Sequence, residues 1–86
     1  MMSWREKLDA LSELGSIEIG YRSNKSTLPP FHVSVRGLEV KDGAVLISAH
    51  GNGFSLQEAV EDYWDQLLDE TLVLDAYKPT RKEVYI

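Results

Sequence analysis

The sequence contains no cysteine, and it has no long apolar run. Without cysteine, disulfides, thiolate metal sites and cysteine nucleophiles are excluded, and a small domain without disulfides suits a reducing compartment. No apolar stretch approaches the about 18 residues that span a bilayer, and residues 1–5 lack the apolar block of a signal peptide. We therefore expect a soluble, cytoplasmic protein without membrane contact.

Basic residues are scarce in the second part of the chain. The net charge is −5 over 86 residues; residues 51–86 hold eight acidic and three basic side chains, whereas residues 1–50 hold six of each. Binding to nucleic acid duplexes requires clustered Lys and Arg that displace counterions. The composition therefore argues against a general nucleic-acid binder.

A helix and three strands are predicted in the first 50 residues. Ser3 and Glu6 have the spacing of a capping box, which predicts a helix over residues 4–14. Alternating apolar and polar residues predict strands at 17–22, 31–40 and 44–50. Gly37 interrupts the alternation of the second strand, which indicates a bulge, and Asp42-Gly43 is typical of a tight hairpin turn.

The segment 51–70 begins with two glycines and continues as an amphipathic helix. We expect Gly51 and Gly53 to break the third strand and form a turn, and Ser55 with Glu58 to form a second capping box. Apolar residues then recur at the spacing of one helix face. They are Leu56, Ala59, Val60, Tyr63, Trp64, Leu67 and Leu68.

These elements predict an α+β fold in the order α-β-β-β-α. We expect one three-stranded antiparallel sheet with both helices packed on one face, leaving the other face open. One domain spans residues 1–86, with a core at 3–70 and a C-terminal extension at 71–86. In the extension, residues 72–74 either finish the helix or begin an extended segment, and residues 84–86 add a short edge strand.

Two motifs resemble the double-stranded RNA-binding domain. FHVSV at 31–35 and GNGFSLQEA at 51–59 correspond to the F-x-V-x-V strand and the G-x-G-x-S-K-K-E-A-K turn and helix of that family. The resemblance covers about residues 3–70 and implies the fold of the family. It does not imply RNA binding, because Leu56, Gln57 and Val60 replace the family's phosphate-contacting lysines. The loop at 23–30 also lacks the family's G-P-x-H motif for the minor groove.

Two further resemblances concern the biological setting. The element order and the S-x-x-E-A helix start resemble the antitoxin of a bacterial toxin–antitoxin pair, whose partly similar fold masks a small RNA-cutting toxin. The whole chain, including DYWDQL at 62–67 and DAYKPTRKEV at 75–84, looks like short uncharacterised reading frames of bacteriophages. A phage-encoded protein would act in the cytoplasm of the host cell.

The acidic face of the helix at 56–70 is the first candidate functional surface. Like charges four residues apart destabilise a helix, so stability alone does not explain this face. It is either a solvated face that keeps the protein soluble or a surface that binds a basic patch of a partner as a phosphate mimic. The candidate residues are Glu58, Glu61, Asp62, Asp65 and Asp69.

The open sheet face is the second candidate surface. Its expected members are His32, Ser34, Arg36, Leu46 and His50. The two histidines would need a third ligand such as Glu18 to hold a metal, so surface histidines are the favoured interpretation. Leu46, together with Phe31 or Leu38, would form an apolar patch suited to a dimer contact.

The sequence favours a non-enzymatic binding protein that acts through protein contacts, with a homodimer as one arrangement. We expect no catalytic residues, no cofactor and no metal. Three alternatives stay open: an antitoxin-like or phosphate-mimic inhibitor of a basic nucleic-acid-binding partner, a metal-assisted hydrolase using the two histidines, and a double-stranded RNA-binding module. The last would use Arg22, Lys25, Arg36 and Lys41.

Overall fold

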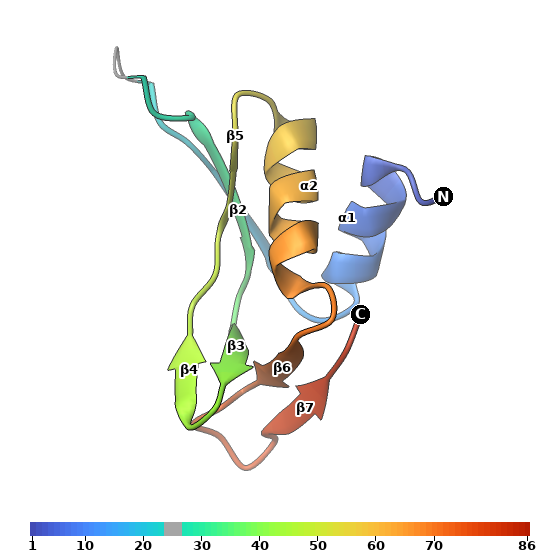
Figure 1. The fold of residues 1–86 in the computed structure, drawn as a ribbon, viewed down its shortest axis with the longest axis vertical. Coiled ribbons are helices and arrows are strands. Elements are labelled where there is room, and N and C mark those ends of the chain that lie inside the picture. The colour runs from blue at the N-terminus through green and yellow to red at the C-terminus, as the bar shows by residue number, and fades with distance from the viewer. Residues whose placement is uncertain (24–26) are drawn as a thin grey trace.

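The computed structural model describes residues 1–23 and 27–86, which form two helices and two antiparallel sheets (Figure 1). The helices are α1 (Trp4–Ser12) and α2 (Leu56–Leu67). The first sheet has the strand order β1-β2-β5, formed by β1 (Ile17–Tyr21), β2 (Phe31–Val35) and β5 (Gly51–Gly53). The second sheet has the order β4-β3-β6-β7, formed by β3 (Leu38–Asp42), β4 (Val45–Ile47), β6 (Thr71–Leu74) and β7 (Lys82–Val84).

The α+β class is confirmed, but the prediction of a single three-stranded sheet is wrong. One long hairpin, with arms at 31–42 and 45–53, runs through both sheets. From the Val33↔Gly51 pair to the Val40↔Ile47 pair, the first arm advances seven residues and the second only four. The surplus is taken up around Gly37, whose φ is 79°. The predicted bulge is therefore a break that separates the two sheets.

Gly51 and Gly53 are not the predicted turn. They form β5, and α2 lies directly on their backbone. A Cβ at Gly51 would stand 2.1 Å from the Ala59 carbonyl oxygen, and one at Gly53 would stand 2.5 Å from the Ala59 amide nitrogen. Glycine is required at both positions because the helix approaches the strand more closely than any side chain allows.

Both helices begin at the predicted serines and lie on the same side of the first sheet (Figure 1). Ser3 and Glu6 exchange both bonds of a capping box, so that prediction is confirmed. At α2, the Ser55 hydroxyl accepts from the Glu58 amide at 3.1 Å. Leu11 of α1 is fully buried in the shared core. No helix of the described residues is long and apolar enough to cross a membrane.

Residues 71–86, expected to be an extension, supply half of the second sheet. β6 lies between β3 and β7, and its Leu72 and Val73 are fully buried. Leu72 to Leu74 are therefore extended rather than helical. β7 is an edge strand of the second sheet, and it covers Lys82–Val84 rather than the expected residues 84–86.

Tyr63 of α2 joins the helix to the first sheet at the point where the hairpin arms diverge. The Val35 amide donates to the Tyr63 hydroxyl oxygen at 3.0 Å, and the tyrosine side chain is fully buried. On the N-terminal side of Gly51, the second arm no longer pairs with β2. The Tyr63 hydroxyl therefore accepts the bond from the Val35 amide, which a paired strand would otherwise accept. Burial raises the pKa of Tyr63, and the bond from Val35 opposes that shift.

We expect Gly51→Ala to destabilise the fold by about 1–3 kcal/mol, because the added methyl must push α2 away from β5. Gly20→Ala is the matched control in the same sheet. Its Cβ would meet only the His32 ring, the movable end of a side chain, so its cost should be smaller. Urea unfolding checks the difference, and equal midpoints for the two variants would contradict the close contact.

We expect Tyr63→Phe to cost about 1–3 kcal/mol, because it leaves the Val35 amide buried without an acceptor. The raised pKa of Tyr63 means that the folded state favours the neutral phenol. The stability that this pKa shift of Tyr63 contributes is fully present below about pH 10, the ordinary tyrosine pKa. It is lost as the pH rises through the folded-state pKa. Urea midpoints measured from pH 8 to 11 should therefore fall less steeply in Tyr63→Phe than in the exposed control Tyr77→Phe.

Candidate functional site

The acidic face of α2 has a structural task at Asp62. The Asn52 amide donates to Asp62 Oδ2 at 2.8 Å, and Gln66 Nε2 donates to the His50 carbonyl at 2.7 Å. Gln66 Nε2 also donates to Asp62 Oδ2 at 3.0 Å. The bond accepted by Asp62 and the bond donated by Gln66 engage the backbone along the outer edge of β5 and the residue before it, where the backbone would otherwise be open to another strand. We call this contact the β5 edge cover.

The remaining acidic candidates divide into engaged and free side chains. Glu58 carries the capped amide of α2, and its carboxylate accepts from the Ser55 hydroxyl at 3.4 Å. Glu61 Oε1 lies 3.8 Å from Nζ of Lys7 in α1. Asp65 and Asp69 are exposed, and neither side chain has a partner within the described part of the chain. The acidic surface open to a partner is therefore centred on Asp65, Asp69 and the neighbouring Glu70.

The opposite edge of the first sheet, β1, has no such cover. The Arg36 amide donates to the Ser16 carbonyl, and the Arg22 amide donates to the Pro30 carbonyl, at either end of the β1–β2 ladder. Since an antiparallel ladder alternates, the even-numbered residues of β1 bond to β2. The amides and carbonyls of Ile17, Ile19 and Tyr21 therefore point outward, and no acceptor or donor among residues 1–23 and 27–86 meets them.

Apolar side chains flank this free edge. Ile19 is 52% exposed and Tyr21 is 64% exposed, although both share the sheet face on which the helices lie. Tyr21 packs edge-on against Phe31 of β2, with ring centroids 5.0 Å apart. Edge strands of native proteins are usually short, charged or covered. β4 and β7 are short, with three residues each, whereas β1 has five residues and stays open.

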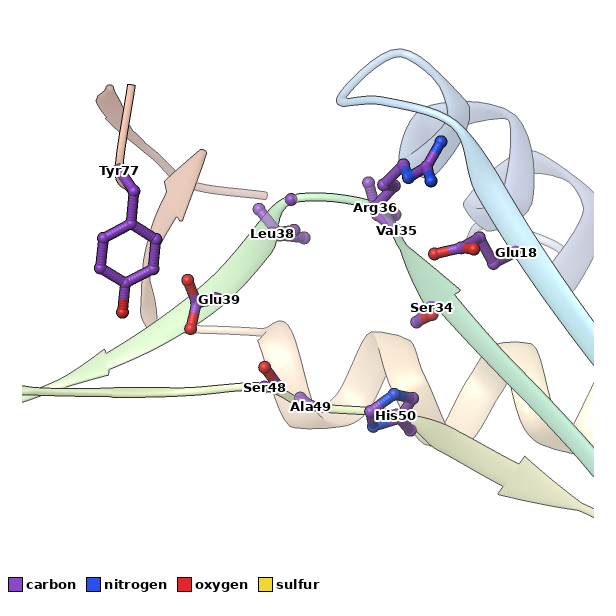
Figure 2. A pocket seen from close by; sticks show the side chains of 11 residues that line it. Glu18, Ser34, Val35, Arg36, Leu38, Glu39, Ser48, Ala49, His50 and Tyr77 are labelled. Carbon is purple, nitrogen blue, oxygen red and sulfur yellow. The ribbon is translucent and has the colours of Figure 1, made fainter. Parts of the chain in front are cut away.

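The open sheet face carries two neighbouring hollows that share His50. One, of about 360 Å³, lies where the two sheets part; Figure 2 shows Glu18, Ser34 and His50 at one end and Glu39 and Tyr77 at the other. The second, of about 370 Å³, is lined by Arg22, His32, His50 and Asn52. The structure thus brings together four of the predicted residues of this face. They are His32, Ser34, Arg36 and His50.

The hollows give no support to metal or nucleophilic chemistry. Within the described residues, no group of three His, Asp or Glu side chains is placed to hold a metal ion. In the same part of the chain, neither Ser34 nor Ser48 is hydrogen bonded to His50. A nucleophile activated by a base requires such a contact.

Leu46 lies apart from the rest of the predicted face. It pairs with Lys41 in the second sheet, and Leu38, its expected apolar neighbour, is 5% exposed in the core. Exposed apolar side chains lie instead at Ile19 and Tyr21 of β1, within the strand predicted at 17–22, and at Val45 and Ile47 of β4. Tyr21 was a weak signal in the sequence, because tyrosine is frequent at protein interfaces, but its exposure follows only from the assembled sheet.

The basic residues proposed for RNA contact are dispersed. Arg22 and Arg36 line different hollows, while Lys41 Nζ is paired with Glu83 Oε2 at 3.0 Å. Lys25 lies outside the described residues.

We expect Asp62→Ala to destabilise the fold by about 0.5–1.5 kcal/mol, because it removes the acceptor of the Asn52 amide. Asp65→Ala is the control on the same helix face, and its effect should stay within about 0.5 kcal/mol. Asp62→Asn keeps an acceptor oxygen and should retain most of the stability. Urea unfolding of the three variants separates these outcomes; equal losses in Asp62→Ala and Asp65→Ala would contradict the β5 edge cover.

Comparison with known proteins adds no identification. No family model, no curated protein and no solved structure matches this chain.

Proposed function

We propose that this chain is a non-enzymatic binding protein that acts through protein contacts, centred on the free edge of β1. The observation that carries the proposal is that the edge of β1 combines backbone groups without a partner among the described residues and the exposed side chains of Ile19 and Tyr21. An added strand gains main-chain hydrogen bonds at such an edge, and neighbouring side chains supply specificity.

The fate of the acidic residues favours this surface over a phosphate mimic. Glu58, Glu61 and Asp62 are engaged in a helix cap, an ion pair and the β5 edge cover. A mimic of a polyanion needs a row of free charges. Among the described residues, the free acidic side chains of this helix face lie mainly at the C-terminal end of α2. Duplex RNA binding is disfavoured for a different reason, because the start of α2 carries no lysine that could contact phosphates.

We extend the proposal to architecture and setting. A double-stranded RNA-binding-domain-like arrangement is supported by the order of α1, β1, the two arms of the long hairpin and α2. Action in a host cytoplasm rests on the absence of cysteine, and phage origin rests on the segments 62–67 and 75–84.

We expect Ile19→Lys with Tyr21→Lys to weaken binding to the protein's partner about tenfold or more, because lysine blunts an open strand edge. Leu68→Lys is the control, since it adds a lysine at another exposed apolar residue, 43% accessible, at the end of α2. Proteins retained by each immobilised variant are identified and their affinities measured by calorimetry.

Two results would contradict the proposed function. One is partner binding that survives the double lysine variant but is lost in Asp65→Asn with Asp69→Asn, which would favour the acidic surface. The other is tight binding of duplex RNA in a low-salt gel shift that weakens steeply with added salt.

A further inference from the structure

We infer that the strand which occupies the free edge of β1 is β1 of a second copy of this chain, paired antiparallel about Gly20. This inference rests on the proposed function and names its partner. Antiparallel pairing of one edge with itself generates a two-fold axis, so each contact occurs twice.

The hydrogen-bonding pattern limits the registers in which two copies of β1 can pair. Only Ile17, Ile19 and Tyr21 direct backbone groups outward, so hydrogen-bonded pairs must join odd-numbered residues of the two copies. A two-fold axis at Gly20 places Ile19 opposite Tyr21 of the second copy, and Tyr21 opposite its Ile19. Both pairs then exchange backbone bonds and bury apolar side chains on the helix side.

Charge complementarity selects this register. With the axis at Gly20, Glu18 of each copy stands directly opposite Arg22 of the other, on the open face. Both side chains are exposed, and neither has an ionic partner within the described residues of its own chain. Opposite charges facing each other across strands stabilise an antiparallel pair.

The two neighbouring registers lack this pairing of charges. With the axis at Ile19, Glu18 would face Gly20 of the second copy and Arg22 would face Ser16. With the axis at Tyr21, Arg22 would face Gly20, so the charges would stay unpaired in both registers. The Gly20 axis also puts the two glycines at a non-hydrogen-bonded pair, where antiparallel backbones approach most closely, about 4.5 Å between Cα atoms. The strand segment IEIGYR is thus complementary to itself in one register.

The two edges of the first sheet differ in a way that favours this occupant. At the outer edge of β5 the Asn52 amide is bonded to Asp62, and the carbonyl of His50, the residue before β5, is bonded to Gln66. A β1 strand of another copy would have to displace both bonds to pair with β5, whereas nothing among the described residues covers the free edge of β1, so β1 to β1 pairing is favoured over head-to-tail addition.

Charge-swap variants test this register. In E18R, and separately in R22E, both symmetry-related pairs become repulsive, and the dimer dissociation constant should rise about tenfold. In an equimolar mixture of E18R with R22E, every introduced charge faces an opposite one, so a mixed dimer of wild-type affinity should form. Sedimentation equilibrium measures all four samples, and circular dichroism checks folding. The milder E18Q and R22Q replace any variant that unfolds, and each should weaken the dimer less.

Three results would overturn the inference: a wild-type monomer at all concentrations, single variants that dimerise like wild type, or a mixture no tighter than its components. The proposed function fails separately. A monomeric wild type that binds another protein in a manner sensitive to Ile19→Lys with Tyr21→Lys would remove the second copy as partner while leaving the edge as the binding surface.

Discussion

The fold depends on the direct contact between α2 and the backbone of β5. Gly51 and Gly53 present no side chains to the helix, and Ala59 is the small residue that faces them. This close approach brings Tyr63 within reach of Val35, and it brings Asp62 and Gln66 around the outer side of the strand. Core packing, helix position and edge protection therefore share one cause, which is the absence of two Cβ atoms.

The break in the hairpin explains why a chain this short forms two sheets. The first arm holds more residues than the second between the paired segments, and Gly37 absorbs the difference. β3 then turns towards residues 71–74, whose buried leucines and valine help to form the second sheet. The C-terminal residues are needed for the core because β3 would otherwise leave Leu38 uncovered.

Local signals predicted the parts of this structure that depend on neighbouring residues. Ser3 and Ser55 mark both helix starts, and the apolar face of α2 is buried at Ala59, Tyr63 and Leu67. The pairing of β3 with β6 joins residues 30–36 positions apart, and alternation alone does not reveal such partners. Gly51 and Gly53 misled the prediction, since glycine marks both a turn and a close approach of backbones.

The candidate surface was the least predictable part for a similar reason. Ile19 and Tyr21 have the pattern of residues covered by helices, but α2 lies over β2 and β5, and α1 packs on α2. Asp62 was grouped with the other acids of one helix face, because its acceptor role depends on the Asn52 amide at the outer edge of β5. Exposure at an edge is a property of the assembled sheet, so it could not be inferred from the order of residues in one strand.

The β5 edge cover also decides how far any assembly of first sheets can grow. A strand with two receptive sides allows copies to add without limit, as in fibres, whereas a sheet closed on one side permits a single joining event. When two copies join through β1, their first sheets form one sheet of six strands. Each outer strand of that sheet is then a β5, which carries the β5 edge cover. In the proposed dimer, Asp62 and Gln66 would thus limit the joining of first sheets to two copies.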